Sequence, residues 1–456
     1  MSQPIDLYLL TYNCNKRSLD AENFVSRLLE TFPDEPAQLY VVGVQELCSI
    51  LDGCFEESAS RHLIALNEVL IEALQEKYGR ETVSGFQTVG MEHVGAIGMV
   101  AITPFPSKFH HVKSARAGCG YLQSSMKGAV AIRMSYSPLG RYSGQSNTSR
   151  KETTELTFAS AHLSAYEGEV YYRRRNSQVH DLMRGLDFGD GYGLLKPSSH
   201  CFFMGDLNYR TTKKFDVNDN CSKDLFKLQD QQIQSTPTIE SLVLQYDELT
   251  MARANGEVFT GFGEGCIDFA PTYKYQIGTA IYNPKRSPSW CDRILFQSTY
   301  KHPEGGTIQQ KAKLRKNGDV AERLPKIHRY NSIKTINSDH QPVYLNLTVP
   351  FEAPESIISS TGYLQILPSS TPNSHYRHDE AEEEDLLLRT NTTSEVISGP
   401  TQIYMSPTKW DTFVQTYVRW FTDRAIGYGL WFGTVPKGRI SVLVLVLLIW
   451  GIYSIN

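Results

Sequence analysis

Short runs of apolar residues recur along the first 350 residues of the chain, separated by polar turns. Each run has roughly the length of a single strand. Between them, residues 21–31 and 59–77 carry apolar side chains at helical spacing. Short strands interleaved with amphipathic helices predict packed sheets covered by helices, an α/β sandwich. The predicted strands lie within IDLYLLTYN, QLYVVGVQE, VGAIGMVAI, GAVAIRM, LTFASAHL, HCFFMGDLN, RILF and PVYLNLTV.

Two segments of this region lack the pattern of a strand or a helix. Residues 140–152, GRYSGQSNTSRKE, are polar and predict a hairpin loop between two strands. Residues 301–337 form a long basic insert, which we expect to be a solvated loop.

The pattern changes after residue 350. Residues 351–405 are rich in Ser, Thr, Asn and acidic residues, with the run DEAEEED at 379–385, and predict a disordered acidic linker. If flexible, a linker of about 50 residues reaches roughly 35–40 Å. If the chain is anchored in a membrane beyond this linker, such a tether would allow the folded region, residues 1–350, to act on that membrane or on an apposed one.

Residues 406–439 are aromatic and amphipathic, and residues 408–432 have helical spacing. This helix is expected either to dock on the folded domain or to lie on a membrane surface. Residues 440–455, ISVLVLVLLIWGIYSI, carry no charge and predict a transmembrane tail anchor, with a buried terminal helix or strand as the alternative. The anchor is favoured because a polar linker precedes the segment and nothing follows it. Lys437 and Arg439 would keep the bulk of the protein in the cytosol.

Composition narrows the class of protein. The 456 residues are 41% hydrophobic, which suits one large α/β domain or two smaller ones. The formal net charge of −4 gives no whole-chain case for nucleic-acid binding, so any affinity for phosphate must be local. The eight cysteines form no CxxC pair, and we expect reduced thiols in a cytosol-facing protein.

Polar residues stand at the ends of five predicted strands, where a sheet delivers side chains to a shared rim. Any one of them alone would be read as a capping or surface residue. Together they offer carboxylates, amides and imidazoles, a set that fits Mg²⁺-assisted attack of water on a phosphate ester better than a zinc site. They are Asn13, Glu46, His162, Asp206 with Asn208, and Asp339 with His340.

Three blocks make the sequence recognisable: MGDLNYR (204–210), RSPSWCDRILF (286–296) and SDHQPVY (338–344). With TYNCN, GVQE, KGAVAIR, AHLSA, RRN and PTYKY, they resemble the signature blocks of the inositol polyphosphate 5-phosphatases, in the same order, over residues 5 to about 350. The resemblance implies a four-layer α/β sandwich of the endonuclease/exonuclease/phosphatase type, followed here by the expected transmembrane tail anchor.

The resemblance also implies catalytic roles. Glu46 would be the main Mg²⁺ ligand, helped by Asn13, with Asp339 beside the metal site. Asp206 would orient and deprotonate the attacking water, and Asn208 would bind the reacting phosphate. His162 and His340 would donate hydrogen bonds to phosphate oxygens. Asp292 would accept a hydrogen bond from His340 and raise its pKa.

Selectivity for inositol phosphates is expected from Tyr273, Lys274 and Arg286, which would hold the neighbouring ring phosphates. Lys127, Arg210 and Lys285 complete the expected substrate-binding set. The chain departs from the family where Met126 replaces an Asn, and where Pro284 stands in place of a Lys. These departures bear on headgroup preference more than on the type of reaction.

The resulting hypothesis is a Mg²⁺-dependent phosphoinositide 5-phosphatase that converts phosphatidylinositol 4,5-bisphosphate to phosphatidylinositol 4-phosphate. Domain order and tail resemble the endoplasmic-reticulum-anchored 5-phosphatases of fungi, so we expect that membrane. We expect a lipid substrate, no nucleic acid and no obligate protein partner. The alternatives are another phosphodiesterase or nuclease of the same superfamily and a catalytically silent phosphoinositide-binding tether.

Overall fold

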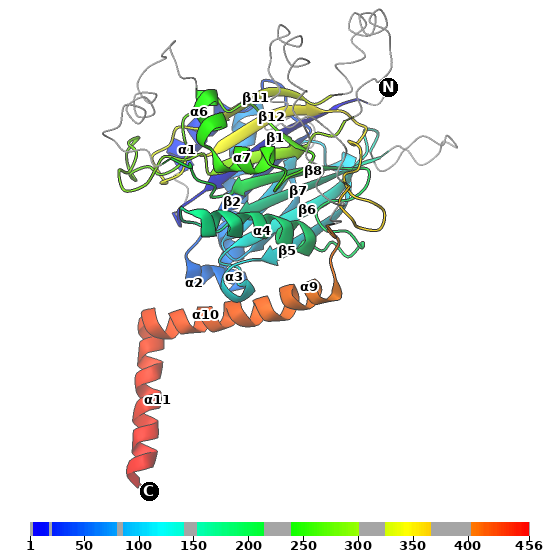
Figure 1. Cartoon of the computed structure of the whole chain (residues 1–456). Coiled ribbons are helices and arrows are strands. Elements are labelled where there is room, and N and C mark those ends of the chain that lie inside the picture. Colours follow the sequence, from blue (N-terminus) through cyan, green and yellow to red (C-terminus); the bar gives the residue numbers. More distant parts are fainter. Residues whose placement is uncertain are drawn as a thin grey trace, which may run out of the picture.

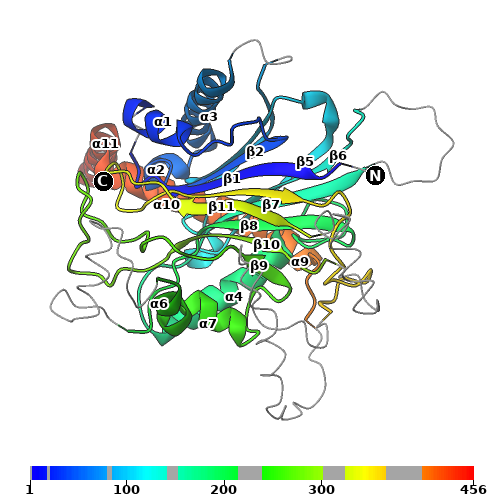
Figure 2. The ribbon, with the colours of Figure 1, turned by 90° about the horizontal axis from the view of Figure 1, so that it is seen from above.

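Two six-stranded sheets pack face to face and form the centre of the molecule (Figures 1 and 2). The structure is a computed structural model that describes residues 3–17, 21–79, 85–140, 153–213, 239–300, 324–365 and 403–455. Each sheet is mixed, with one parallel pair at its centre and antiparallel neighbours around it.

The first sheet has the strand order β11-β12-β1-β2-β4-β3, and β1 and β2 are its parallel pair. Its strands are β1 (Ile5–Asn13), β2 (Leu39–Gln45), β3 (Gln87–Val94), β4 (Ile97–Thr103), β11 (Lys326–Ser332) and β12 (Val343–Val349).

The second sheet has the order β5-β6-β7-β8-β10-β9, with β7 and β8 parallel. Its strands are β5 (Phe109–Gly118), β6 (Gly128–Tyr136), β7 (Thr154–His162), β8 (Ser199–Asp206), β9 (Phe262–Glu264) and β10 (Asp292–Gln297).

Alternation along each central strand divides its side chains between two buried layers. In β1, Leu7 and Leu9 face the second sheet, whereas Tyr8 and Leu10 face the helices on the other side. Both faces of the strand are therefore apolar, which explains why β1 reads as a nearly continuous hydrophobic run.

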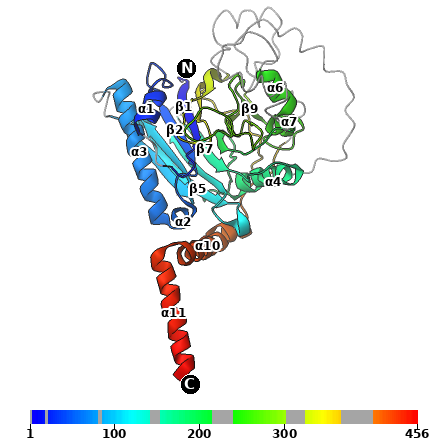
Figure 3. The same ribbon diagram turned by 90° about the vertical axis from the view of Figure 1, so that its left-hand side faces the viewer.

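Helices cover the outer face of both sheets (Figure 3). The first sheet is covered by α1 (Ala21–Leu29) and α3 (Glu56–Tyr78), and the second by α4 (Glu169–Gly185) and α7 (Glu248–Ala254). The result is a four-layer sandwich, as predicted. The shorter elements are α2 (Ile50–Gly53), α6 (Ile239–Tyr246) and the 3₁₀ turns η1 (Pro106–Lys108) and η2 (Tyr121–Gln123).

The helices predicted over 21–31 and 59–77 are confirmed, as are strands in all eight apolar runs. The loop predicted over 301–337 is wrong for Lys326–Ser332, which forms the edge strand β11. Only Tyr330 of this strand is buried, and such an edge leaves little hydrophobic signal. Residues 301–323 and 141–152 lie outside the described residues, although β6 and β7 on either side of the latter do pair.

The chain remains folded for some distance after residue 350. Ile357 and Ile358 are buried against the second sheet, and Met405 joins the same apolar cluster. Backbone hydrogen bonds join Leu364 N to Ile403 O (2.8 Å) and Met405 N to Gly362 O (2.8 Å). The middle of the expected linker, residues 366–402, lies outside the described residues.

A long helical segment follows, made of α9 (Lys409–Phe413), the π-helical turn η5 (Val414–Val418) and α10 (Arg419–Thr434). It packs along one end of the sandwich, against α2, η2 and β5, so the helix expected over 408–432 docks on the folded domain (Figure 1). After it, α11 (Pro436–Ile455) runs away from the domain. Its stretch Pro436–Ser454 is long and apolar enough to cross a membrane, with a mean hydropathy of 1.6, and only 6% of it is buried.

Candidate active site

Strand direction brings the expected catalytic residues to one edge of the sandwich. Asn13 ends β1, Glu46 follows β2, His162 ends β7 and Asp206 ends β8. Because each sheet has its parallel pair at the centre, these four carboxyl-terminal strand ends lie together. Asp292 joins them by starting β10, which runs antiparallel and pairs with β8 at Asp206.

Asp206 lies at the centre of this cluster and is almost fully buried. Asn13 Nδ2 donates to Asp206 Oδ2 at 2.9 Å, and His162 Nε2 lies 3.3 Å from the same oxygen. Burial disfavours the charged form of the carboxyl, but its neighbours, chiefly the cation His340 and then His162 and Lys127, outweigh burial and hold the pKa of Asp206 well below its usual range. Asp206 is therefore ionised throughout the neutral range.

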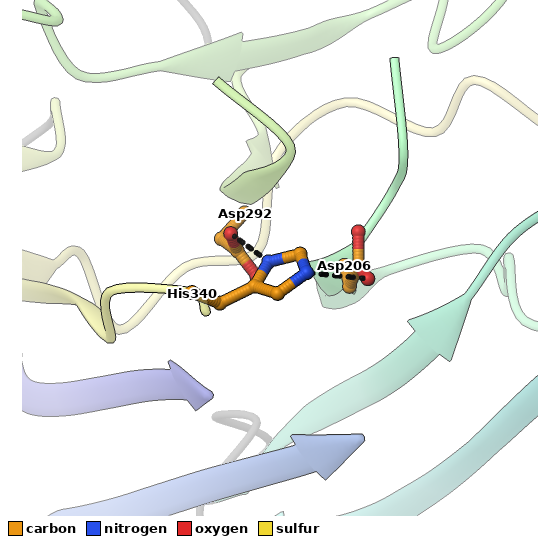
Figure 4. Close-up of side chains that lie close together, drawn as sticks. All are labelled: Asp206, Asp292 and His340. Atoms are coloured by element: carbon orange, nitrogen blue, oxygen red, sulfur yellow. Dashed lines mark hydrogen bonds and ion pairs between the residues drawn. The ribbon is translucent and has the colours of Figure 1, made fainter. Parts of the chain in front are cut away.

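Asp292 and His340 form a buried pair directed at Asp206 (Figure 4). His340 Nδ1 lies 2.9 Å from Asp292 Oδ2, and its Nε2 lies 3.8 Å from Asp206 Oδ2. Burial alone would lower the pKa of His340, but Asp292 and Asp206 raise it to about 9. The imidazole is therefore held as a cation near neutral pH. Burial raises the pKa of Asp292 to about 6 despite the opposing charge of His340.

Thr272 supports this pair, since its hydroxyl donates to Asp292 Oδ2 at 2.6 Å. The other oxygen, Asp292 Oδ1, is buried and has no hydrogen-bond partner within the described part of the chain. Ligand atoms of Asp206, Asp292 and His340 all lie within 4.8 Å of one another. Because His340 Nδ1 already bonds Asp292, we read the trio as a hydrogen-bonded chain that orients the imidazole.

Lys127 and His162 form a second pair beside Asp206. Lys127 Nζ contacts His162 Nε2, and because an ammonium can only donate, the imidazole accepts. Burial lowers the pKa of Lys127 to about 8, and burial together with Lys127 lowers the pKa of His162. His162 is thus neutral in this state, and the positive charge here belongs to Lys127.

Glu46 faces a cleft of about 130 Å³ whose walls include Lys127 and His162. Its carboxylate is only partly buried, and the nearest cation is the exposed Lys16, whose Nζ lies 3.4 Å from Glu46 Oε2. Glu46 has a φ of +47° and Asn208 a φ of +57°. Residues other than glycine rarely adopt this left-handed backbone region, which costs about 1–3 kcal/mol for each residue. Residues held in it concentrate at functional sites.

The carboxylate of Glu46 and the amide oxygen of Asn13 are the kind of donors that suit a hard divalent cation. Glu46 can be reached from the cleft, and Asn13 bonds Asp206 through Nδ2, which leaves its amide oxygen as the second donor. Cys48 and Cys54 also line the cleft, but burial raises the pKa of both thiols. Glu46 and Asn13 are therefore the residues that would hold such an ion.

The remaining expected residues divide into two groups. Arg210 is buried, bonds Asn208 Oδ1 and lies 4.2 Å above the ring of Tyr273, which itself packs on His340. Lys274 Nζ reaches Asp339 Oδ2 at 2.6 Å.

Lys285 and Arg286 are exposed on the loop before β10. No hydrogen bond or ion pair of the described residues joins either side chain to the cluster. The structure therefore brings the first group to the site and leaves these two at its border.

Sequence reasoning missed three residues that support the site. Thr272 bonds Asp292, Lys16 neutralises Glu46, and Ser338 Oγ donates to Asn13 O at 2.7 Å. Thr272 and Ser338 lie inside the PTYKY and SDHQPVY blocks, so the blocks themselves were the available signal. Nothing in the sequence pointed to Lys16.

Comparison with known proteins places this arrangement in a family. Residues 10–346 match the model of Endonuclease/Exonuclease/phosphatase family 2. The type IV inositol polyphosphate 5-phosphatase 11 of Arabidopsis thaliana is 30% identical over 50% of this chain and 54% of its own length. Human synaptojanin-2 is 26% identical over 68% of this chain and 19% of its own length. The chain thus spans about half of the first relative and about a fifth of the second.

A solved structure shares the fold. The inositol polyphosphate 5-phosphatase domain of SPsynaptojanin, in complex with inositol (1,4)-bisphosphate and calcium ion, matches with a TM-score of 0.56 and 24% identity, covering 76% of this chain and 84% of that one. The relatives' names confirm the resemblance to inositol polyphosphate 5-phosphatases, and the matched model covers most of the chain. The chain therefore belongs to the endonuclease/exonuclease/phosphatase family.

Proposed function

We propose that the chain is a Mg²⁺-dependent phosphoinositide 5-phosphatase whose main substrate is phosphatidylinositol 4,5-bisphosphate. The observation that carries the proposal is the series of side chains Asp292, His340 and Asp206, which a hydrogen bond and an ion pair join. It lies beside Lys127, at the cleft that Glu46 lines. The names of the similar proteins support hydrolysis of a 5-phosphate. The bound inositol (1,4)-bisphosphate and calcium ion of the structural relative agree with a metal-assisted site of this class.

A cation held by Glu46 and Asn13 would neutralise the phosphate and stabilise the charge that develops in the transition state. The protein's own groups do the rest. Asp206, ionised and buried, accepts a hydrogen bond from the attacking water and takes its proton as the new P–O bond forms and the bond from phosphorus to the inositol 5-oxygen breaks. The leaving oxygen takes up a proton from water, and Asp206 later returns its proton to solvent. His340, a cation through Asp292, donates from Nε2 to a phosphate oxygen.

Basic side chains place the substrate. Lys127 and Arg210 reach the reacting phosphate together with Asn208, and Tyr273 and Lys274 contact the inositol ring and its 4-phosphate. Lys274 already bonds Asp339, so in this proposal a ring phosphate competes with that carboxylate for the ammonium. The exposed Lys285 and Arg286 can move onto the headgroup from the border.

The C-terminal helix α11 would determine the membrane in which the enzyme meets its lipid substrate. We propose that α11, 20 residues long, is a transmembrane anchor, because a helix of this length spans about 30 Å. Lys437 and Arg439 at its start keep the catalytic domain in the cytosol. The uncharged part, residues 440–455, suits the thinner bilayer of the endoplasmic reticulum.

The test is phosphate release by the full chain in lipid vesicles. We expect hydrolysis of phosphatidylinositol 4,5-bisphosphate to the 4-phosphate, its loss on chelation with EDTA and its return with Mg²⁺. Asp206→Ala should lower the rate by about 10³-fold or more. If the wild-type chain releases phosphate from no 5-phosphorylated inositide, lipid or soluble, the proposal fails.

A further inference from the structure

The segment Lys409–Thr434, hereafter the docked helix, holds the sandwich with one face and leaves an aromatic face uncovered. We propose that this aromatic face lies in the headgroup region of the membrane that α11 enters, so that the catalytic domain is held against that membrane and acts on lipid within it. The proposal rests on the proposed function only for its lipid substrate. In this proposal the domain is attached to the membrane rigidly, through the docked helix, and not by a flexible tether; this rigid attachment is hereafter called the mount.

The docked face is built from polar contacts with loops of the second sheet. Gly118 N donates to Gln415 Oε1 at 2.7 Å, and Gln415 Nε2 donates to Gly118 O at 3.0 Å. The amide of Gln415 thus satisfies both backbone groups of the last residue of β5. Two turns further, Thr422 Oγ1 donates to Leu122 O at 3.2 Å.

The same face reaches the wall of the catalytic cleft. Asp423 is buried, and its Oδ1 accepts from Ser125 N at 2.7 Å. Ser125 lines the cleft that contains Glu46 and Lys127. The docked helix is therefore fixed to the domain directly beside the site.

Close packing completes the contact at the other end of the helix. A Cβ built on Gly427 would meet Cys54 Cβ at 2.7 Å and the ring of Phe55 at 3.2 Å. Only glycine lets the helix approach α2 this closely. Next to it, the ring of Tyr428 packs edge-on against Phe55, with centroids 5.6 Å apart.

The opposite face carries large exposed side chains, each of which lies three or four residues from another of them, the spacing of one helix face. Within this segment, all of which the structure describes, the two acidic residues, Asp411 and Asp423, bond Arg184 and Ser125 of the domain. Lys409 and Arg424 remain near the aromatic row. Aromatic rings with basic charge are the combination that anionic membrane surfaces bind. The row consists of Trp410, Phe413, Tyr417, Trp420, Phe421 and Phe432, with Tyr428 at its edge, where the half-exposed ring also contacts Phe55.

A sharp corner directs α11 away from the domain (Figures 1 and 3). Pro436 excludes helical geometry at the preceding residue, and Val435 is accordingly extended, with φ −85° and ψ 132°. Gly438 lies so close to Trp431 that a Cβ there would meet its carbonyl oxygen at 2.2 Å. The corner is thus tight, and a bilayer spanned by α11 has its surface along the docked helix.

The undescribed segment 366–402 does not lengthen this mount. Its two ends are joined by the bond from Leu364 N to Ile403 O, and Met405 is buried in the domain immediately afterwards. A chain that returns to its starting point adds nothing to the distance between site and anchor. The reach of 35–40 Å expected for a flexible linker of this length therefore does not apply, and an apposed membrane lies out of range.

The test compares lipid in the same vesicle with lipid in separate vesicles. The full chain is reconstituted into vesicles, with phosphatidylinositol 4,5-bisphosphate either in those vesicles or in protein-free ones, and soluble inositol 1,4,5-trisphosphate gives a reference rate. We expect the same-vesicle rate to exceed the separate-vesicle rate by about 10²-fold, the usual order for an intramolecular encounter. Equal rates would overturn the proposal.

A matched pair of variants isolates docking. Gly427→Leu combined with Gln415→Ala wedges the helix off the domain, whereas at Gly429 nothing lies within 4 Å and Gly429→Leu leaves the contact intact. The double variant should lower the ratio of the same-vesicle rate to the separate-vesicle rate by about tenfold or more. Its rate on soluble inositol 1,4,5-trisphosphate should change by no more than about twofold. The control should keep the wild-type ratio. An unchanged ratio in the wedged variant, with its soluble rate retained, contradicts the proposal.

A readout that needs no activity separates this inference from the proposed function. Brominated lipids should quench the fluorescence of Trp420, measured as the difference between the full chain and Trp420→Phe, both carrying Asp206→Ala. If no inositide is hydrolysed but Trp420 is quenched, the proposed function fails and the mount stands. If lipid is hydrolysed and Trp420 is not quenched, the mount fails alone.

Discussion

The protonation of His340 depends on two carboxylates that differ in their own environments. Asp292 is paired with His340 Nδ1 and supported by Thr272, whereas Asp206 faces Nε2 at a longer distance. A raised pKa means that the stabilisation from this charge is complete below the ordinary value of about 6.5. It is lost as pH rises through about 9.

Replacing Asp292 by Asn should therefore change both rate and pH dependence. The amide no longer fixes the Nδ1–H tautomer or the charge, so kcat should fall by about 10²–10⁴-fold. The pKa of His340, read from the alkaline limb of the pH profile or by NMR, should move down toward its ordinary value. Asp268→Asn, an equal change of charge at an exposed position of the preceding loop, serves as control. A lower rate with an unshifted pKa would mean that Asp292 acts only through packing.

Lys127 should limit activity on the alkaline side at a lower pH than His340 does. Its pKa is lowered to about 8 by burial, so the ammonium is lost above that pH and the dianionic substrate loses a partner. We expect kcat/KM to fall as pH rises above about 8. In Lys127→Met the rate should be lower and its remaining decline should move toward the pKa of His340. A wild-type profile that stays flat to pH 10 would contradict this assignment.

At the scale of elements, a buried ion cluster fastens β10 to its neighbours. Arg293 has no exposed side-chain surface, and it donates to Glu264 of β9 at 2.6 Å and to Asp247 at the start of α7 at 2.7 Å. Tyr330 of β11 donates to the same Glu264. The cluster thus joins the two sheets beneath the strand that begins with Asp292.

Removing the cation should destabilise the fold far more than an ordinary surface change. Arg293→Met removes the cation that pairs with the buried Asp247 and leaves the buried Glu264 with Arg253 as its cationic partner, and we expect a loss of about 3–5 kcal/mol in the free energy of unfolding. Denaturant unfolding of the full chain in detergent measures it. Arg329→Met, the same exchange on the exposed side of β11, should stay within about 0.5 kcal/mol. Similar values for both variants would show that the cluster is energetically neutral.

The elements differ in how far the sequence predicted them. β1 and β12 are buried on both faces and appear as apolar runs, whereas β11 is an edge strand whose register depends on the neighbouring β12. The strand-end positions of Asn13, His162 and Asp206 followed from those runs. That these ends share a rim was also predicted, but which ends lie next to one another was not, because this depends on the order of strands in two sheets, which no local pattern contains. Lys16 had no signal for the same reason: its partner Glu46 belongs to another strand end.

At the scale of the whole molecule, segments that are far apart in the sequence contact one another in ways that their order along the chain does not suggest. The polar stretch after residue 350 suggested a tether, yet its two described ends bond each other and the helix beyond it returns to the catalytic domain. Composition identified the segment but not the position of its ends. Those are set by contacts with β5, α2 and the second sheet.

Shortening the undescribed segment should accordingly leave catalysis unchanged. Deleting residues 371–390 keeps both ends of the bridge, so we expect same-vesicle and separate-vesicle rates within about twofold of wild type. Both rates are measured in the vesicle assay described above. A deletion that suppresses the same-vesicle rate would indicate that this length of chain is needed after all.

The bond between Leu364 and Ile403 has a consequence for proteolysis. Cleavage anywhere in 366–402 would yield two fragments that remain associated through this bridge, the buried Met405 and the contacts of Gln415 and Asp423. The catalytic fragment of a nicked chain would therefore stay attached to the helical segment that leads into α11, the proposed anchor. Shedding of the catalytic fragment would require a second event that separates the helix from the domain.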